Sequence, residues 1–334
     1  MSNPLLKVEN LEVRFDTEDG IVEAVNDVSF HVNEGETLGI VGESGSGKSV
    51  TNLAVLGLIP QPPGRISRGR VEFRGQNLID LSNRELAKFR GNDIAMIFQD
   101  PMTSLNPFLT VADQLTEVTR LHMGHSRKQA LRHAITWLER VGIPSAAKRI
   151  FEYPHQFSGG MRQRVMIAMA LSCNPEVLIA DEPTTALDVT IQAQILELMK
   201  ELQKEHGTAI IMITHDLGVI ANICHRVLVM YAGKIVEESN VGPLFANPRH
   251  PYTLGLLDSI PRWDEEESQM LKAIAGQPPH MVDPPPGCSF YPRCPYRIDQ
   301  CRAVSPELVD RPDNGRFACF VDVDSVKPVE VVGE

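Results

Sequence analysis

Apolar and polar residues alternate along the first part of the chain. The segments LLKVENLEVRF and VEAVNDVSFHV follow this period of two, which is typical of antiparallel strands with one buried face. Asp19 and Gly20 lie between the two segments, and Asp-Gly is a common hairpin turn. The pattern therefore predicts that the chain begins as an antiparallel sheet.

Three later segments are instead short, continuous apolar runs. They read TLGIVG, VLIADEP and AIIMITH, and each ends in glycine or polar residues. Because a strand that is covered on both faces carries apolar residues at every position, these segments predict central strands of a parallel sheet.

Two segments between these strands have helical periodicity. In SRKQALRHAITWLERVGI, Ser126 and Gln129 form a capping-box pattern, and the expected apolar face is Leu131, Ile135, Leu138 and Val141. In VTIQAQILELMKELQKEHG, Gly207 is the expected stop, and the expected face is Ile191, Ile195, Leu198 and Leu202. Strands that alternate with helices predict an α/β domain.

Composition restricts the class of protein. Lysine and arginine total 32 against 43 acidic residues, a net charge of -11, which argues against a nucleic-acid-binding face. No window has the roughly 18 consecutive apolar residues of a membrane helix, and the first residues lack the pattern of a secretion signal. We therefore expect a cytoplasmic protein of two structural parts.

A glycine-rich loop follows the first apolar run. GESGSGKS, residues 42–49, matches the phosphate-binding pattern G-x-x-x-x-G-K-[ST] at every fixed position. Lys48 is expected to reach the β and γ phosphates, and the Ser49 hydroxyl to bind Mg²⁺. The residues expected to contact the nucleotide here are Gly42, Glu43, Ser44, Gly45, Ser46, Gly47, Lys48, Ser49 and Val50.

Two adjacent acidic residues end the second apolar run. Asp181 is placed to hold Mg²⁺, directly or through water, and Glu182 to act as general base on the attacking water. Two such acids could also merely cap the next helix, but that alternative leaves their occurrence beside a complete phosphate loop unexplained.

The segment FSGGMRQR, residues 157–164, resembles the signature motif of the ATP-binding-cassette ATPases, and the other motifs occur in that family's order. By this resemblance Gln99 corresponds to the Q-loop glutamine, Asp188 to the D-loop and His215 to the switch histidine. Phe15 matches the aromatic position that stacks on adenine, with a purely structural phenylalanine as the alternative. The resemblance covers residues 5 to about 241.

The resemblance implies a mechanism. Two cassettes pair head to tail, so that the signature residues Ser158, Gly159 and Gly160 cover the partner's ATP. It implies Mg²⁺ ligands among Ser49, Gln99 and Asp181, and a catalytic set of Glu182, His215, Gln99 and Lys48. The fold implied is a mostly parallel central sheet with an antiparallel β subdomain and a helical subdomain near residues 100–158.

Further segments resemble one branch of the family. Three features are similar to those of the oligopeptide and dipeptide permease ATPases. They are Met161 directly after SGG, the segment PMTSLNP and the segment HPYTLGLLDSIP. That branch implies a peripheral protein on the cytoplasmic face of the inner membrane. Its implied partners are two transmembrane permease subunits, an external peptide-binding protein and a second, related but different ATPase. Proline-rich segments after about Val241 predict a boundary there, with a cassette at residues 1–245 and an extension at 246–334.

Four of the six cysteines are close to the C-terminal end. Cys288, Cys294, Cys301 and Cys319 are spaced C-x5-C-x6-C-x17-C in a proline-rich region, whereas Cys173 and Cys224 have apolar neighbours. A reducing compartment disfavours disulfides, and zinc or a [4Fe–4S] cluster both accept four thiolates. The absence of C-x2-C pairs disfavours zinc, and the resemblance to peptide-permease ATPases favours the cluster; a site without metal is the third possibility.

Other functions compete with peptide import. A nickel importer shares much of the same C-terminal pattern. A soluble cassette protein of translation or DNA repair is disfavoured by the acidic charge and by the short interval between Gln99 and Ser158. A regulatory cassette that does not hydrolyse ATP is the third alternative, and the presence of Glu182 and His215 argues against it.

Overall fold

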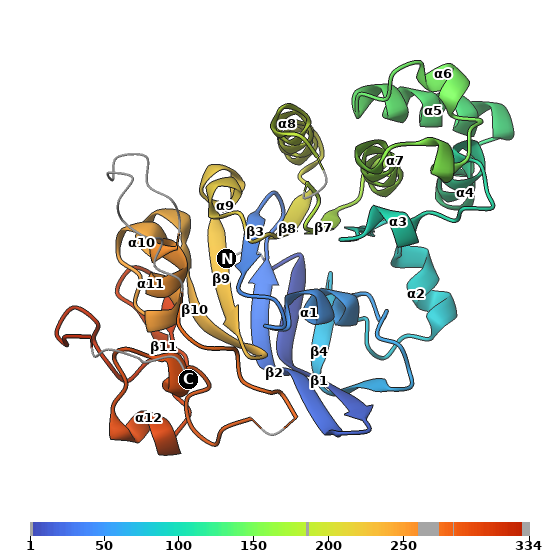
Figure 1. Ribbon diagram of the computed structural model, residues 1–334. Coiled ribbons are helices and arrows are strands. Elements are labelled where there is room, and N and C mark those ends of the chain that lie inside the picture. Colours follow the sequence, from blue (N-terminus) through green and yellow to red (C-terminus); the bar gives the residue numbers. More distant parts are fainter. Residues whose placement is uncertain (1–2, 185–186, 260–273, 283, 329–334) are drawn as a thin grey trace. The chain divides into compact units, whose positions relative to one another are not determined.

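The computed structural model describes residues 3–184, 187–259, 274–282 and 284–328 (Figure 1). The chain folds into two compact units, each assembled from separate stretches of sequence. The first unit consists of Met1–Leu6, Val32–Thr37 and Phe73–Thr214, and the second of Lys7–His31, Leu38–Glu72 and His215–Glu334.

The first unit contains three parallel strands. Strand β7 (Val177–Asp181) pairs with β6 (Ile94–Ile97) on one side and with β8 (Ala209–Ile213) on the other. In this register Ile179 lies opposite Met96 and Ile211. Every residue of β7 and β8 is buried, which confirms the prediction from their unbroken apolar runs.

Helices make up most of the rest of the first unit, which also contains the short strand β5. Helices α4, α5 and α7 pack together, and α3 packs on α7 (Figure 1). The elements are β5 (Gln76–Asn77), α2 (Asn83–Phe89), α3 (Pro101–Ser104), α4 (Val111–His122), α5 (Arg127–Arg140), α6 (Ala146–Arg149), η1 (Pro154–Gln156), α7 (Gly159–Leu171) and α8 (Val189–His206).

The start of α5 agrees with the sequence, and its buried face agrees in part. The Gln129 side chain accepts hydrogen bonds from the Ser126 amide at 2.9 Å and from its hydroxyl at 2.6 Å. Leu131 and Ile135 are only half-buried, and the buried residues are Ala130, Ala134, Trp137 and Leu138. Leu138 and Val141 are thus buried as predicted, whereas the pattern of large aliphatic residues missed Ala130, Ala134 and Trp137.

Helix α8 ends as predicted. Gly207 has a left-handed backbone with φ of 68°, and its amide donates to the Gln203 carbonyl. Ile195, Leu198 and Leu202 are buried as predicted, whereas Ile191 is half-buried.

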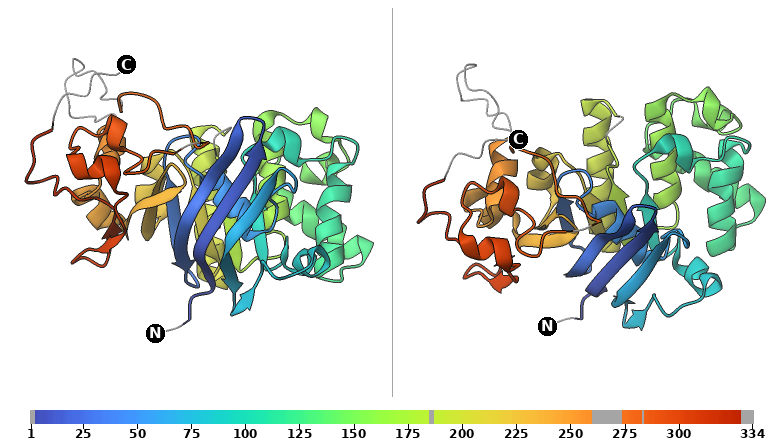
Figure 2. Two further views of the ribbon diagram at one scale, coloured as in Figure 1. Left: turned by 90° about the horizontal axis from the view of Figure 1, so that it is seen from below. Right: turned by 60° about the horizontal axis from the view of Figure 1, so that its bottom comes forward.

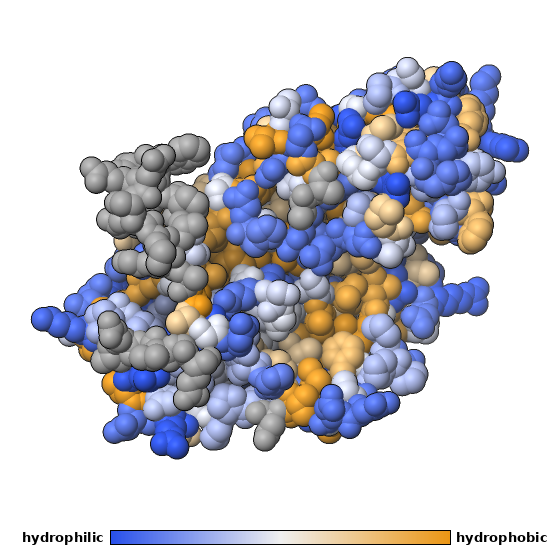
Figure 3. Space-filling view, in the orientation of Figure 1, coloured by the Kyte–Doolittle hydropathy of each residue, from blue (hydrophilic) through white to orange (hydrophobic). Residues whose placement is uncertain are grey.

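The second unit begins with the predicted hairpin. Strands β1 (Leu6–Thr17) and β2 (Gly20–Val32) are joined by a two-residue turn, and β4 (Gly64–Phe73) lies on the other side of β1. Figure 2 shows these three strands side by side. Hydrophobic residues gather over β1, β4 and α1 (Lys48–Val55) on the face drawn in Figure 3.

A second sheet of this unit joins the phosphate loop to the C-terminal extension. Strand β3 (Thr37–Val41) is parallel to β9 (Arg226–Tyr231), and β9 is antiparallel to β10 (Lys234–Asn240). Strand β12 (Arg316–Phe317) pairs with β10 and with β11 (Val309–Asp310). The extension therefore continues the sheet that carries β3.

Short helices complete the second unit. They are α9 (Leu217–Ile223), α10 (Val241–Ala246), α11 (Pro251–Asp258), η2 (Tyr291–Arg293) and α12 (Asp299–Ala303). Of all the helices within the described ranges, none has the length and apolarity needed to cross a bilayer. The division into 1–245 and 246–334 stays a prediction.

Candidate functional site

The loop Gly42–Ser49 connects β3 to α1. Gly42 has φ of 152° and Gly47 has φ of 99°, a backbone region that side chains disfavour. A Cβ on Gly42 would lie 2.2 Å from the Met230 carbonyl oxygen, and one on Gly47 would lie 2.5 Å from that of Ala24. These two positions therefore require glycine, and the loop is held tightly against neighbouring backbone.

Lys48 lies at the start of α1 with its ammonium inside the loop. Its Nζ donates to the Gly42 carbonyl at 2.7 Å, the Glu43 carbonyl at 2.8 Å and the Ser46 hydroxyl at 3.2 Å. Lys48 and Ser46 are buried, whereas Ser44 and Gly45 are exposed. The loop is thus a turn of backbone with a buried cation at its centre, an arrangement suited to phosphate.

Two other predicted nucleotide residues belong to the same unit. Phe15 is half-buried on β1, and a Cβ on Gly64 of β4 would lie 2.8 Å from its ring. His215 is exposed just before α9, where Asp216 caps the helix by accepting from the amides of Gly218 and Val219. Ser49 and Val50 are half-buried in the first turn of α1.

The two predicted carboxylates follow the central strand of the first unit. Asp181 is the last residue of β7 and is buried, with an exposed fraction of 4%. Glu182 has φ of 47°, and its amide donates to the Ile213 carbonyl at 2.9 Å. A left-handed backbone conformation is uncommon for glutamate and costs free energy. At Glu182 it turns the chain sharply after the strand.

Gln163 joins this turn to helix α7. Its side chain is fully buried, and its Nε2 donates to the carbonyls of Pro183 and, at 3.4 Å, Glu182. Helix α7, which begins in the signature segment, is therefore hydrogen-bonded to the backbone of Glu182, the predicted general base.

The signature residues form an exposed helix start. The Ser158 hydroxyl accepts from the Met161 amide at 3.3 Å as N-cap of α7. Ser158 and Gly159 are exposed and Gly160 is half-buried. Asp188 caps α8 by accepting from the Ile191 amide at 3.0 Å, and Gln99 is exposed two residues after β6.

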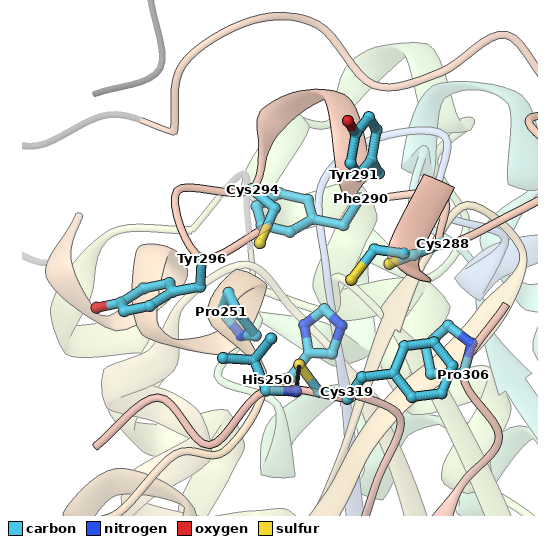
Figure 4. Close-up of a pocket in the computed structure, with 12 residues that line it drawn as sticks. His250, Pro251, Cys288, Phe290, Tyr291, Cys294, Tyr296, Pro306 and Cys319 are labelled. Atoms are coloured by element: carbon cyan, nitrogen blue, oxygen red, sulfur yellow. Dashed lines mark hydrogen bonds between the residues drawn. The ribbon is translucent and has the colours of Figure 1, made fainter. Parts of the chain in front are cut away.

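The four C-terminal cysteines line one pocket of the second unit. Cys288, Cys294, Cys301 and Cys319 share it with His250, Phe290, Tyr291 and other residues, and Figure 4 shows Cys288, Cys294 and Cys319 around it. The Cys288 amide also donates to the Cys301 carbonyl at 2.8 Å. Burial raises the pKa of the Cys294 thiol to about 12 and that of Cys319 to about 11.

The pocket gives the predicted metal centre no direct support. Across the part of the chain that the structure describes, no three histidine, cysteine or acidic side chains are arranged to hold a metal ion. The cysteines are thus brought to one place, as the spacing suggested, as free thiols of which Cys294 and Cys301 are buried and Cys288 and Cys319 are half-buried. The iron–sulfur cluster and its zinc alternative remain hypotheses.

Three residues that contact the predicted site were missed by sequence reasoning. Gln163 lies in the quoted signature segment, but its partners are a turn about 20 residues away. Tyr252 and Arg293 both bind Glu43 of the phosphate loop from more than 200 residues away. No local pattern marks such long-range partners.

Comparisons with known proteins agree with this arrangement. Residues 25–185 match the family model described as "ABC transporter", and residues 236–301 match "Oligopeptide/dipeptide transporter, C-terminal region". The chain is 57% identical to the oligopeptide transport ATP-binding protein OppD of Bacillus subtilis, covering 98% of this chain and 92% of that protein. It is 52% identical to the dipeptide transport ATP-binding protein DppD of the same organism, covering 95% and 94%.

Solved structures show the same fold. A dimeric, post-hydrolysis structure of the ATP-binding cassette MJ0796 with ADP and Pi has a TM-score of 0.64 at 29% identity, covering 71% of this chain and 98% of that one. CbiO1 of Clostridium perfringens, part of the ABC transporter complex cbiONQ, has a TM-score of 0.59 at 30% identity, covering 74% and 92%.

Fold and loop together define an ATP-binding-cassette ATPase, as the motifs predicted. Within that class, the chain belongs to the ATP-binding subunits of the oligopeptide/dipeptide ABC transporter family.

Proposed function

We propose that this protein hydrolyses ATP to drive peptide import through a membrane permease. The observation that carries the proposal is the loop Gly42–Ser49 with the buried Lys48 ammonium inside it, in a chain whose relatives are named for oligopeptide and dipeptide transport. A nickel importer or a cassette unconnected with transport is less favoured, because these relatives are named for peptide transport.

The residues of the loop bind and orient the triphosphate. The Lys48 ammonium exchanges the carbonyls of Gly42 and Glu43 for β and γ phosphate oxygens, and backbone amides of the loop add hydrogen bonds. The ring of Phe15 stacks on adenine. Mg²⁺, when bound, neutralises charge on the phosphates, and its proposed ligands are Ser49, Gln99 and Asp181.

Hydrolysis is assigned to Glu182 and His215. Glu182 accepts the proton of the attacking water as general base, and His215 stabilises charge on the γ phosphate. The exposed Ser158, Gly159 and Gly160 act on the nucleotide of a second cassette, with Asp188 at the contact between the two. Their exposure at the start of α7 supports this, because a helix start with free amides attracts phosphate.

The decisive test is transport by the assembled complex. Lys48→Ala should abolish ATP binding to the full-length chain, and Glu182→Gln should retain ATP binding while stopping hydrolysis. Uptake competition with dipeptides, longer peptides and Ni²⁺ then identifies the substrate class. Unchanged hydrolysis in Glu182→Gln would contradict the assignment of the general base, and selective Ni²⁺ uptake would favour the alternative importer.

The proposed assembly has four kinds of partner. A second, related ATPase completes the cassette pair. Two transmembrane permease subunits change conformation when the cassettes bind and hydrolyse ATP, and an external peptide-binding protein delivers the substrate. The protein then lies on the cytoplasmic face of the inner membrane without spanning it. Co-purification from membranes tests this, and association with ribosomes or DNA would contradict it.

The cysteine pocket is the proposed place of a [4Fe–4S] cluster, with zinc as the alternative. Support comes from the four cysteines, which line one pocket. A cluster would bind the thiolates and so offset the burial that keeps Cys294 and Cys319 protonated. Anaerobic purification should give brown protein with iron and sulfide, lost in Cys294→Ser but kept in Cys173→Ser; colourless protein without metal would refute it.

A further inference from the structure

Glu43 is the second residue of the phosphate loop, and the C-terminal extension contacts it on two sides. Its amide donates to the Tyr252 hydroxyl at 2.7 Å. Its carboxylate accepts hydrogen bonds from both terminal nitrogens of the Arg293 guanidinium, from Nη1 at 2.6 Å and from Nη2 at 3.0 Å. Its carbonyl accepts from Lys48. It also accepts from the Ser46 amide at 3.2 Å. All the polar groups of Glu43 are therefore engaged, and the extension supplies two of the four partners.

Arg293 is built for this contact. Its side chain is 4% exposed, and the Glu43 carboxylate raises the pKa of its guanidinium. The remaining donors bind the carbonyls of Ala275 at 2.9 Å and Ile274 at 3.3 Å, and the Tyr231 hydroxyl at 3.3 Å. Because every N–H group of the guanidinium has a hydrogen-bond acceptor, the Arg293 side chain is fixed and holds the carboxylate in one orientation. A lysine ammonium lacks this planar pair of donors and could not do so.

The surroundings make this support rigid. The rings of Tyr231, Tyr252 and Phe290 pack on one another with centroids 4.6 to 5.5 Å apart. Arg293 itself follows Phe290 and Tyr291 and directly precedes Cys294, all of which line the cysteine pocket (Figure 4). The side chain that reaches the phosphate loop thus comes from the segment that forms the pocket.

We propose that Arg293 and Tyr252 are positioning residues for ATP, which hold the Glu43 corner of the phosphate loop and neutralise its carboxylate. The inference rests on the proposed function of this loop. The charge matters because Glu43 would otherwise place an anion in the loop that binds a triphosphate. The C-terminal extension is therefore part of the nucleotide site, and a distortion of the cysteine pocket changes nucleotide affinity through Arg293.

The test measures MgATP and MgADP dissociation constants for the full-length chain by titration calorimetry. Arg293→Gln should weaken MgATP binding roughly tenfold and MgADP binding less, because the exposed carboxylate repels the more highly charged nucleotide more strongly. The double variant Glu43→Gln, Arg293→Gln should regain most of this loss, since it removes the repelling charge. Tyr252→Phe should weaken both nucleotides by similar, smaller factors, because it removes only the acceptor for the Glu43 amide.

Controls separate this inference from its premise. Arg302→Gln removes an exposed charge from α12 in the same extension and should bind as the wild type does. Lys48→Ala tests the loop itself: if the wild type does not bind ATP, or Lys48→Ala binds it normally, the proposed function fails. If the wild type binds ATP and Arg293→Gln binds it equally well, only this inference is overturned. Equal losses of MgATP and MgADP without recovery in the double variant would also overturn it, by assigning Arg293 a purely structural role.

Discussion

The Arg311 guanidinium contacts the carboxylate of Glu237 at 2.6 Å, and both side chains are almost fully buried. Glu237 lies on β10 and also accepts from the amides of Arg249 and His250, each at 2.8 Å. Burial raises the pKa of Glu237 in spite of these contacts. The pair therefore fastens the end of the extension to the sheet that carries the phosphate loop.

Removal of one partner should be costly. Arg311→Ala leaves a buried carboxylate without its cation, so we expect the free energy of unfolding to fall by about 3–5 kcal/mol. Glu237→Gln combined with Arg311→Met should lose less, because no buried charge is left. Denaturant unfolding measures both, with exposed Arg302→Ala as the control. A loss below about 1 kcal/mol in Arg311→Ala would contradict this account.

The bond from Gln163 to the turn at Glu182 predicts a catalytic defect without a binding defect. Gln163→Ala frees the carbonyls of Glu182 and Pro183, so the general base is held less precisely. ATP hydrolysis by the assembled complex should fall roughly 10- to 100-fold, while ATP affinity of the isolated chain stays within about twofold. Gln194→Ala, an exposed change on α8, is the matched control. Equal hydrolysis in the two variants would refute the role of Gln163.

A substitution at Gly159 tests the proposal that the signature residues contact the nucleotide of a second cassette. A Cβ at this position would meet no atom of the described residues within 4 Å, and the residue begins α7, where alanine is a better helix former. Gly159→Ala should therefore leave stability and ATP binding of the single chain unchanged. Hydrolysis by the cassette pair should fall strongly, because the methyl group occupies the space for the neighbour's phosphate. Full activity of the pair would exclude such close approach.

Cys224 predicts a stability change at alkaline pH. Burial raises the pKa of this thiol from 9.0 to about 12. The folded thiol keeps its proton at pH values where the unfolded thiol has lost it. The contribution of the protonated Cys224 thiol to the free energy of unfolding is therefore complete below pH 9. It is lost as the pH rises toward 12, because only the unfolded thiol loses its proton in this range. Between pH 9 and 10 the wild type should lose about 1 kcal/mol more than Cys224→Ala in denaturant unfolding. Identical pH profiles would contradict this.

The sequence by itself determined the features that depend on local chemistry. The phosphate loop requires glycines and a lysine at fixed spacing, so GESGSGKS predicts its own conformation. Strands β7 and β8 follow from unbroken apolar runs, and the end of α8 follows from Gly207. Each of these depends on residues that are neighbours in the chain, which is why a pattern can reveal them.

Tertiary structure decided the contacts between distant segments. Arg293 and Glu43 are 250 residues apart, and only the packing of the extension beside β9 and β10 brings them together. The buried alanines of α5 and the bond from Gln163 to Pro183 likewise depend on which helix or turn lies opposite. The four cysteines share a pocket, as their spacing suggested, yet their arrangement was decided by the packing around His250 and Phe290. Such choices depend on shape and charge matched across the whole fold, and no short segment of sequence carries that information.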